Sequence, residues 1–215
     1  MTPVPAGSRY VNKRSVKDRS RRILDPVVSL LFSLGVPPLL VSFIGLAAAI
    51  AGTWVIVRGS LFWGGIWTLF SGICDVLDGG LARRAGRETK FGAFIDSTFD
   101  RVSEFFVYGG LLVYFADHGH PRVLLVVVWV AMGASFLVSY ARARIEGLGS
   151  SCTVGLLERP ERFVLLVIGL LAGPRATALA VAIIALGAVY TVVERICHAY
   201  RVTRPQAGPG DERRE

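Results

Sequence analysis

The sequence predicts an all-α integral membrane protein, with six transmembrane helices preceded by an N-terminal amphipathic helix at the membrane interface. Of its 215 residues, 53% are hydrophobic and only 19% are charged, and the mean hydropathy is +0.53. A water-soluble domain of this size is rarely so apolar. The apolar residues also form long charge-free runs, and most basic residues lie between them. Lipid is therefore the expected solvent for most of the chain.

The first apolar run, residues 26–57, is too long for one crossing and is divided at Pro37-Pro38. A crossing takes roughly 20 apolar residues, and proline both lacks an amide donor and restricts its predecessor. We therefore expect a basic interfacial helix over 9–35, followed by a first span over about 38–57. The five further spans are expected at about 61–83, 93–116, 122–144, 160–173 and 176–197. Residues 1–204 would then form a single membrane domain.

The distribution of basic residues predicts the orientation of these spans. Of the 24 Lys and Arg residues, 21 lie on segments that would share one side of the membrane, leaving Arg58, Arg122 and Arg175 opposite. By the positive-inside rule, both termini face the cytoplasm, as an even number of spans requires. We expect a multi-pass protein of the cell (inner) membrane with a disordered cytoplasmic tail over 205–215. Its net charge of +8 favours anionic lipids and substrates, and no nucleic-acid partner is expected.

Four aspartates lie within the segment CDVLDGGLARRAGRETKFGAFIDSTFDR, residues 74–101. Asp75 and Asp78 share one helix face by their spacing, and Asp96 and Asp100 share another. Ionised carboxylates in membrane helices need compensation by cations or water. An oxygen-only set without histidine or thiolate favours Mg²⁺, Mn²⁺ or Ca²⁺, and up to two ions would approach neutrality. The alternative is a set of salt bridges to Arg83, Arg84, Arg87 and Arg101.

Two glycines, Gly79 and Gly80, follow the first acidic pair. A glycine at this position lets a ligand approach the backbone closely. Small residues here, namely Gly79, Ala82 and Gly86, can also serve close packing between helices. Beside four carboxylates, ligand approach is the favoured interpretation.

These residues fill every position of the signature D-x2-D-G-x2-A-R-x8-G-x3-D-x3-D, and the chain resembles the CDP-alcohol phosphotransferases over essentially its whole length. The matching residues are Asp75, Asp78, Gly79, Ala82, Arg83, Gly92, Asp96 and Asp100. The resemblance implies that the four aspartates surround two metal ions, Mg²⁺ or Mn²⁺, and that Asp100 is the catalytic base. It also implies a homodimer and a binding site for the CDP-lipid. That site would comprise Asp75, Asp78, Gly79, Ala82, Arg83 and Gly92.

The reaction that the resemblance implies is transfer of a phosphatidyl group from CDP-diacylglycerol to a hydroxyl of a small polar acceptor. Asp100 would accept the proton of that hydroxyl, whose oxygen attacks the β-phosphorus, and CMP leaves. Bound metal would offset the developing charge and hold the reactants in line. Active site and termini would both be cytoplasmic.

The acceptor is indicated by residues 139–163, SYARARIEGLGSSCTVGLLERPERF. They resemble the subgroup that makes phosphatidylinositol phosphate, in which S-Y-x-K-A-R-A-E precedes E-R-P-E-R. By that likeness, Arg142, Arg162 and Arg195 bind the phosphate of inositol phosphate, although Arg142 replaces the usual lysine. A second departure is Leu39, where the family commonly has Asn or Asp. The alternative for these arginines is ordinary rim charge.

Other functions stay open at this point. A cluster of guanidinium groups suits a dianionic acceptor better than a neutral or cationic alcohol, but glycerol 3-phosphate is also a dianion. A cation transporter could use intramembrane carboxylates, although these would be expected near span midpoints and broken helices. A noncatalytic scaffold would need no carboxylate cluster.

Overall fold

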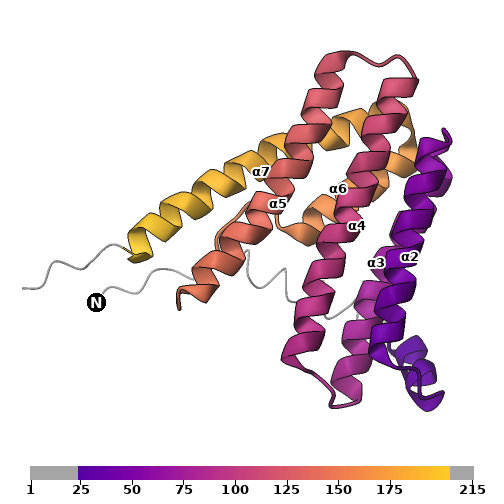
Figure 1. Cartoon of the computed structure of the whole chain (residues 1–215), viewed down its shortest axis with the longest axis vertical. Helices are drawn as coiled ribbons and strands as arrows, with labels where there is room; N and C mark the ends of the chain where they lie inside the picture. The colour runs from indigo at the N-terminus through magenta and orange to yellow at the C-terminus, as the bar shows by residue number, and fades with distance from the viewer. Residues whose placement is uncertain (1–23, 204–215) are drawn as a thin grey trace, which may run out of the picture. The chain divides into compact units, whose positions relative to one another are not determined.

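The structure is a computed structural model that describes residues 24–203, and this part of the chain is helical without any strand. A short helix over Leu24–Ser33 precedes six longer ones (Figure 1). These are α2 (Pro38–Val57), α3 (Leu61–Arg84), α4 (Lys90–Asp117), α5 (Arg122–Gly147), α6 (Arg159–Ala172) and α7 (Pro174–Thr203). The all-helical prediction is confirmed for these residues. Residues 9–23 of the predicted interfacial helix and the predicted tail over 205–215 lie outside the described residues.

The start of α4 and the end of α7 differ from the prediction for local physical reasons. Helix α4 begins three residues earlier than expected because Thr89 caps it: the backbone N–H of Gly92 donates to Thr89 Oγ1 over 2.9 Å. Helix α7 continues to Thr203 instead of ending near residue 197, since no proline or glycine interrupts the chain before Pro205.

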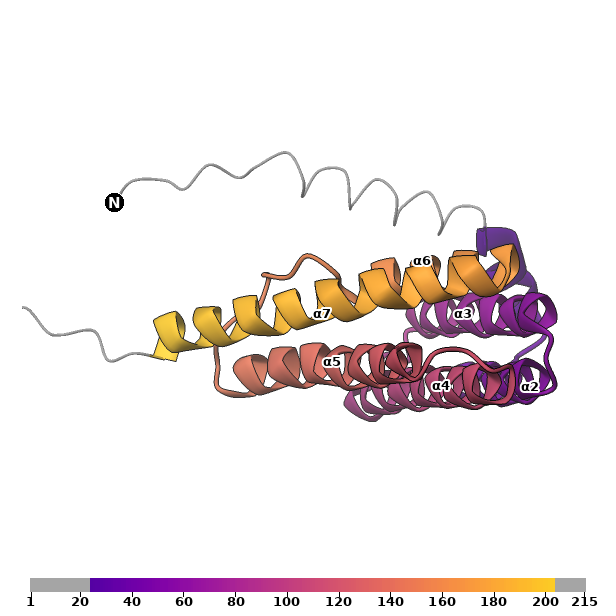
Figure 2. The same ribbon diagram turned by 90° about the horizontal axis from the view of Figure 1, so that it is seen from above.

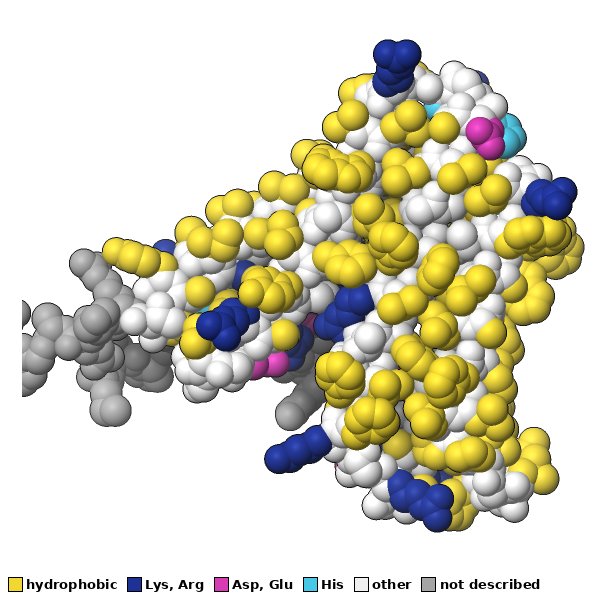
Figure 3. Space-filling view, in the orientation of Figure 1, with side chains coloured by type: hydrophobic (Ala, Val, Ile, Leu, Met, Phe, Trp, Pro, Cys, Tyr) yellow, Lys and Arg dark blue, Asp and Glu magenta, His cyan; other side chains and the backbone are white. Residues whose placement is uncertain are grey.

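Three of the described helices, α2, α5 and α7, are long and apolar enough to cross a membrane by length and composition. Helices α3 and α4 carry the acidic residues, and α6, with 14 residues, covers about 21 Å at 1.5 Å per residue. Large hydrophobic side chains are exposed along the helices, with Trp129 64% and Leu186 76% accessible. Figure 3 shows hydrophobic side chains spread over the visible surface. Such exposure fits a protein that is surrounded by lipid.

The contacts divide the chain into two compact units. Among the described residues, the first unit extends to Trp54 and includes Ile66–Val107, and the second comprises Val55–Gly65 and the chain from Tyr108 onward. Helices α2, α3 and α4 therefore contribute residues to both units.

The first unit is built on a cluster of apolar side chains from the Leu24–Ser33 helix, α2 and α3. Its buried members are Val28, Val41, Cys74, Leu77 and Leu81. Helices α2 and α3 approach closely, because a Cβ added to Gly45 would lie only 2.9 Å from Cys74 Cβ. Helix α4 contacts α2 through Phe99, whose ring packs edge-on against Phe43 with centroids 5.0 Å apart. This packing places the acidic segments of α3 and α4 in the same unit.

In the second unit, α7 runs beside α5 and α6 (Figures 1 and 2). Ala134 and Val138 of α5 pack against Ala188 of α7. At the start of α7, the hydroxyl of Thr177 donates to the carbonyl of Gly169 on α6 over 2.9 Å. Small residues let these backbones approach closely, as is common in helix pairs within membranes.

Candidate active site

Three of the four predicted metal ligands meet in the first unit. Asp75 and Asp78 lie on α3 and Asp96 lies on α4, and one carboxylate oxygen from each is within 4.8 Å of the other two. The spacing of three residues places Asp75 and Asp78 on one face of α3. The convergence of α3 with α4 adds Asp96, which is 18 residues beyond Asp78. The structure therefore brings three of the four predicted ligands together, and their role as metal ligands stays a prediction.

Asp78 is the most enclosed member of this group, with 6% of its surface accessible. Its Oδ2 accepts a hydrogen bond from Ser42 Oγ of α2 over 2.5 Å. The same hydroxyl lies 3.4 Å from Pro38 O, but it has one proton, and the carboxylate is nearer. Sequence reasoning missed Ser42, because a serine in an apolar helix more often bonds to its own backbone.

Asp100 lies on α4 one turn beyond Asp96, but it is not in the group that meets within 4.8 Å. It is partly buried. Its predicted roles as a metal ligand and as the catalytic base therefore stay predictions.

The donor set of the three aspartates fits a hard divalent cation. Two ionised carboxylates whose oxygens lie within 4.8 Å of each other repel each other by at least about 3 kcal/mol at an effective dielectric of about 20. A cation among them offsets that repulsion. All three donors are carboxylate oxygens, the ligand type that Mg²⁺ and Mn²⁺ prefer.

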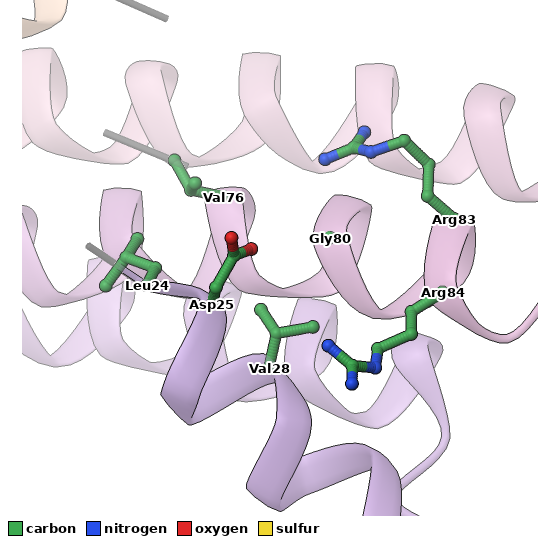
Figure 4. Close-up of a pocket in the computed structure, with 7 residues that line it drawn as sticks. All are labelled: Leu24, Asp25, Val28, Val76, Gly80, Arg83 and Arg84. Carbon is green, nitrogen blue, oxygen red and sulfur yellow. The ribbon is translucent and has the colours of Figure 1, made fainter. Parts of the chain in front are cut away.

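Two further signature residues, Gly79 and Arg83, lie near the end of α3. The site of a Cβ on Gly79 would be 3.4 Å from Arg83 Nη1, so the guanidinium folds back over the glycine. Arg83 and Arg84 line a pocket of about 320 Å³ with Gly80 and with Asp25 of the Leu24–Ser33 helix (Figure 4). This pocket combines two cations and one carboxylate with the apolar side chains of Leu24, Val28 and Val76.

The surroundings of two other signature residues, Ala82 and Gly92, do not indicate which ligand they would contact. Ala82 is partly buried on α3. Gly92 lies in the first turn of α4, where a Cβ would come within 3.1 Å of the capping Thr89 Oγ1. Contact of Ala82 and Gly92 with the CDP-lipid stays a prediction.

The three arginines predicted to bind the acceptor phosphate all belong to the second unit. Arg162 of α6 and Arg195 of α7 are buried, with 1% and 2% accessible, which distinguishes them from ordinary rim charges. Arg142 of α5 is half-exposed, and its Nε donates to Glu146 Oε1 over 2.9 Å. The charges of Arg142 and Arg162, and the opposite charge of Glu158, all act on Arg195. An anion at this cluster would offset the mutual repulsion of the guanidinium groups.

The two buried guanidinium groups donate to backbone carbonyls. Arg162 Nη1 donates to Leu157 O over 3.2 Å. Arg195 Nε donates to Val154 O over 3.0 Å, and its Nη1 donates to Val138 O. These bonds partly compensate the cost of burying charge, and they orient both side chains.

Comparison with solved structures gives close matches over most of the chain. Phosphatidylinositol phosphate synthase of Mycobacterium tuberculosis, solved with CDP-DAG bound, is 33% identical with a TM-score of 0.77, covering 83% of this chain and 94% of that one. The same enzyme in complex with manganese and citrate is 32% identical with a TM-score of 0.78, covering 87% and 96%.

Comparison with known sequences agrees with the structural matches. Phosphatidylinositol phosphate synthase of Streptomyces avermitilis is 37% identical over 187 residues, which cover 81% of this chain and 77% of that protein. The family profile described as CDP-alcohol phosphatidyltransferase matches residues 35–193, which include the whole signature. The resemblance predicted from the signature is confirmed, and the chain belongs to the CDP-alcohol phosphatidyltransferase family.

Proposed function

We propose that this protein is a phosphatidylinositol phosphate synthase, which transfers the phosphatidyl group of CDP-diacylglycerol to a hydroxyl of inositol phosphate and releases CMP. The observation that carries this proposal is the convergence of Asp75, Asp78 and Asp96 in a member of this family. The acceptor is supported by 37% identity to a phosphatidylinositol phosphate synthase and by the burial of two arginines in the second unit.

The metal site in this proposal consists of Asp75, Asp78 and Asp96, with Asp100 as a further ligand when two ions are bound. Mg²⁺ and Mn²⁺ both fit the carboxylate donors, and a relative was solved with manganese. When bound, the metal neutralises the diphosphate of the CDP-lipid and the charge that develops during transfer.

Residues of α3 would bind the nucleotide side of the CDP-lipid. Gly79 and Ala82 leave room for a ligand beside the helix, because neither has a large side chain. Arg83, whose guanidinium lies over Gly79, supplies a cation for the diphosphate. Gly92 would contribute through the start of α4.

The acceptor phosphate would bind to Arg142, Arg162 and Arg195. Buried guanidinium groups interact strongly with a dianion because water screens them little. Asp100 would accept the proton of the acceptor hydroxyl, since a positioned carboxylate can act as a general base. The new bond joins the hydroxyl oxygen to the β-phosphorus, the bond from this phosphorus to the bridging oxygen breaks, and CMP carries that oxygen away.

We propose that residues 1–204 act as a single catalytic domain. In this proposal the domain has six spans and a preceding interfacial helix, lies in the cell (inner) membrane with both termini cytoplasmic, and forms a homodimer. Light scattering of the purified protein in detergent tests the dimer, since a monomeric mass at all protein concentrations contradicts it.

The orientation can be tested by thiol labelling in intact cells. The native cysteines, Cys74, Cys152 and Cys197, are first replaced by serine. A membrane-impermeant reagent should then label a cysteine at His118, between α4 and α5, and should not label one at Glu88, between α3 and α4. The reverse pattern would contradict cytoplasmic termini.

The acceptor is tested with the purified enzyme, CDP-diacylglycerol and Mg²⁺. CMP release and lipid product are measured with inositol 1-phosphate, inositol, glycerol 3-phosphate and serine as separate acceptors. We expect turnover with inositol 1-phosphate to exceed that with each other acceptor, and loss of turnover in Asp78→Asn but not in Asp117→Asn. Preference for glycerol 3-phosphate would refute the acceptor assignment. Cation flux into liposomes without CMP release would refute the enzymatic function.

A further inference from the structure

The segment that links α5 to α6, residues 148–158, runs beside α7 (Figure 2), and hydrogen bonds fasten it there. The amide of Leu157 donates to Thr191 Oγ1 over 3.1 Å. One turn further along α7, Arg195 Nε donates to Val154 O over 3.0 Å. His198 Nε2 lies 3.0 Å from Ser151 O. The 148–158 link is therefore held along almost two turns of α7.

Thr191 joins the link to both buried arginines. Its side chain is fully buried, and its single hydroxyl proton goes to Gly187 O over 2.7 Å, which leaves the oxygen to accept the Leu157 amide. The carbonyl of Leu157 in turn accepts a hydrogen bond from Arg162 Nη1. Leu157 thus connects Thr191, through its N–H, to the guanidinium of Arg162, through its carbonyl.

Gly155 connects the same link to Arg195. Its φ is +141°, a region that residues with a Cβ rarely adopt. A Cβ at Gly155 would lie 2.8 Å from Thr191 Cγ2 and 3.3 Å from Arg195 Nη2. The backbone of the link is therefore in contact with both side chains, and a shift of the link would move the guanidinium of Arg195.

We propose that Thr191 is a positioning residue for the acceptor, which acts by fastening the 148–158 link so that Arg162 and Arg195 are oriented to bind a phosphate. Thr191 does not itself contact the acceptor in this proposal. The inference rests on the proposed function, because it concerns the phosphate-binding arginines of the same reaction.

The test compares the full-length enzyme with Thr191→Val, which keeps the shape and removes the hydroxyl, and with Thr191→Ser, which keeps the hydroxyl. Thr177→Val is the matched control, because Thr177 is equally buried on α7 and its hydroxyl also bonds to backbone carbonyls. We expect Thr191→Val to raise the KM for inositol 1-phosphate by about 5- to 10-fold. The KM for CDP-diacylglycerol and kcat should change less than about twofold, and Thr191→Ser should restore the acceptor KM.

The positioning role would be overturned if Thr191→Val raised both KM values equally or left the acceptor KM unchanged. It would also be overturned if Thr177→Val raised the acceptor KM without raising the KM for CDP-diacylglycerol. If Thr191→Val does not fold, Gly155→Ala tests the coupling from the side of the link, and an unchanged acceptor KM there refutes it. Wild-type turnover of inositol 1-phosphate is measured first. Its absence refutes the proposed function, whereas its presence with no KM split in the variants refutes only the role of Thr191.

Discussion

The hydrogen bond from Ser42 to Asp78 offers a direct test of the metal site. It joins α2 to the most enclosed aspartate of the group over 2.5 Å. In Ser42→Ala, the Asp78 carboxylate loses this donor and is free to rotate away from the geometry in which it meets Asp75 and Asp96. We expect metal binding to weaken while the fold is retained.

The magnitude follows from the type of bond. A hydrogen bond to a charged group contributes about 1.5–3 kcal/mol, and loss of a partner that orients a metal ligand typically reduces affinity or activity by about 10- to 100-fold. Since 1.4 kcal/mol corresponds to about tenfold, the two ranges agree. Ser42 is only partly buried, so water can replace part of the bond. We therefore expect the lower end, an increase of about tenfold in the Mg²⁺ concentration that gives half-maximal activity.

The assay is CMP release at saturating CDP-diacylglycerol and inositol 1-phosphate over a series of Mg²⁺ concentrations, with Mn²⁺ binding measured separately by electron paramagnetic resonance. Ser42→Thr retains the hydroxyl and should behave like the wild type. The matched control is Thr53→Val, because Thr53 also lies on α2 but its hydroxyl donates to Ala49 O within the helix, over 2.9 Å.

The reasoning would be refuted by a Mg²⁺ titration of Ser42→Ala that superimposes on that of the wild type. An equal shift in Thr53→Val would also refute it, because the effect would then come from α2 as a whole rather than from Asp78.

Three further predictions concern the same reaction. Asp100→Asn should lower kcat by about 100-fold or more, as loss of a general base does, while CDP-lipid binding measured by equilibrium filtration changes little. Near-normal turnover would remove Asp100 from the base role, and Asp117→Asn is the control. Arg195→Ala should raise the KM for inositol 1-phosphate by about 10-fold or more and the KM for CDP-diacylglycerol much less. The control is Arg201→Ala, at an exposed position, and equal increases in the two KM values argue against phosphate binding. Treatment with EDTA should abolish CMP release and added Mn²⁺ should restore it, so activity that persists in EDTA contradicts the metal site.

Much of the helical architecture was predictable because its cause is local. Apolar runs separated by glycine, proline and charge predicted α2 over 38–57 as observed, and the start of α3 and α5 at residues 61 and 122. The start of α4 was misplaced, since whether Thr89 caps the helix depends on the rotamer of its hydroxyl. The acidic pairs were predictable for the same local reason, because helical spacing alone places Asp75 and Asp78 on one face.

The sequence by itself determined that lipid surrounds most of the chain, where most helices lie, which family signature is present and which carboxylates suit a hard metal ion. Each of these depends on residue type and short spacing. Only the tertiary structure decided which residues hold these groups in place. Ser42 reaches Asp78 across 36 residues of sequence, and Arg195 meets Val154 across 41. No periodicity encodes such pairs, because they arise where two separately formed helices or a returning link happen to pack. For the same reason, Arg162 and Arg195 resemble rim charges in the sequence and are buried in the fold.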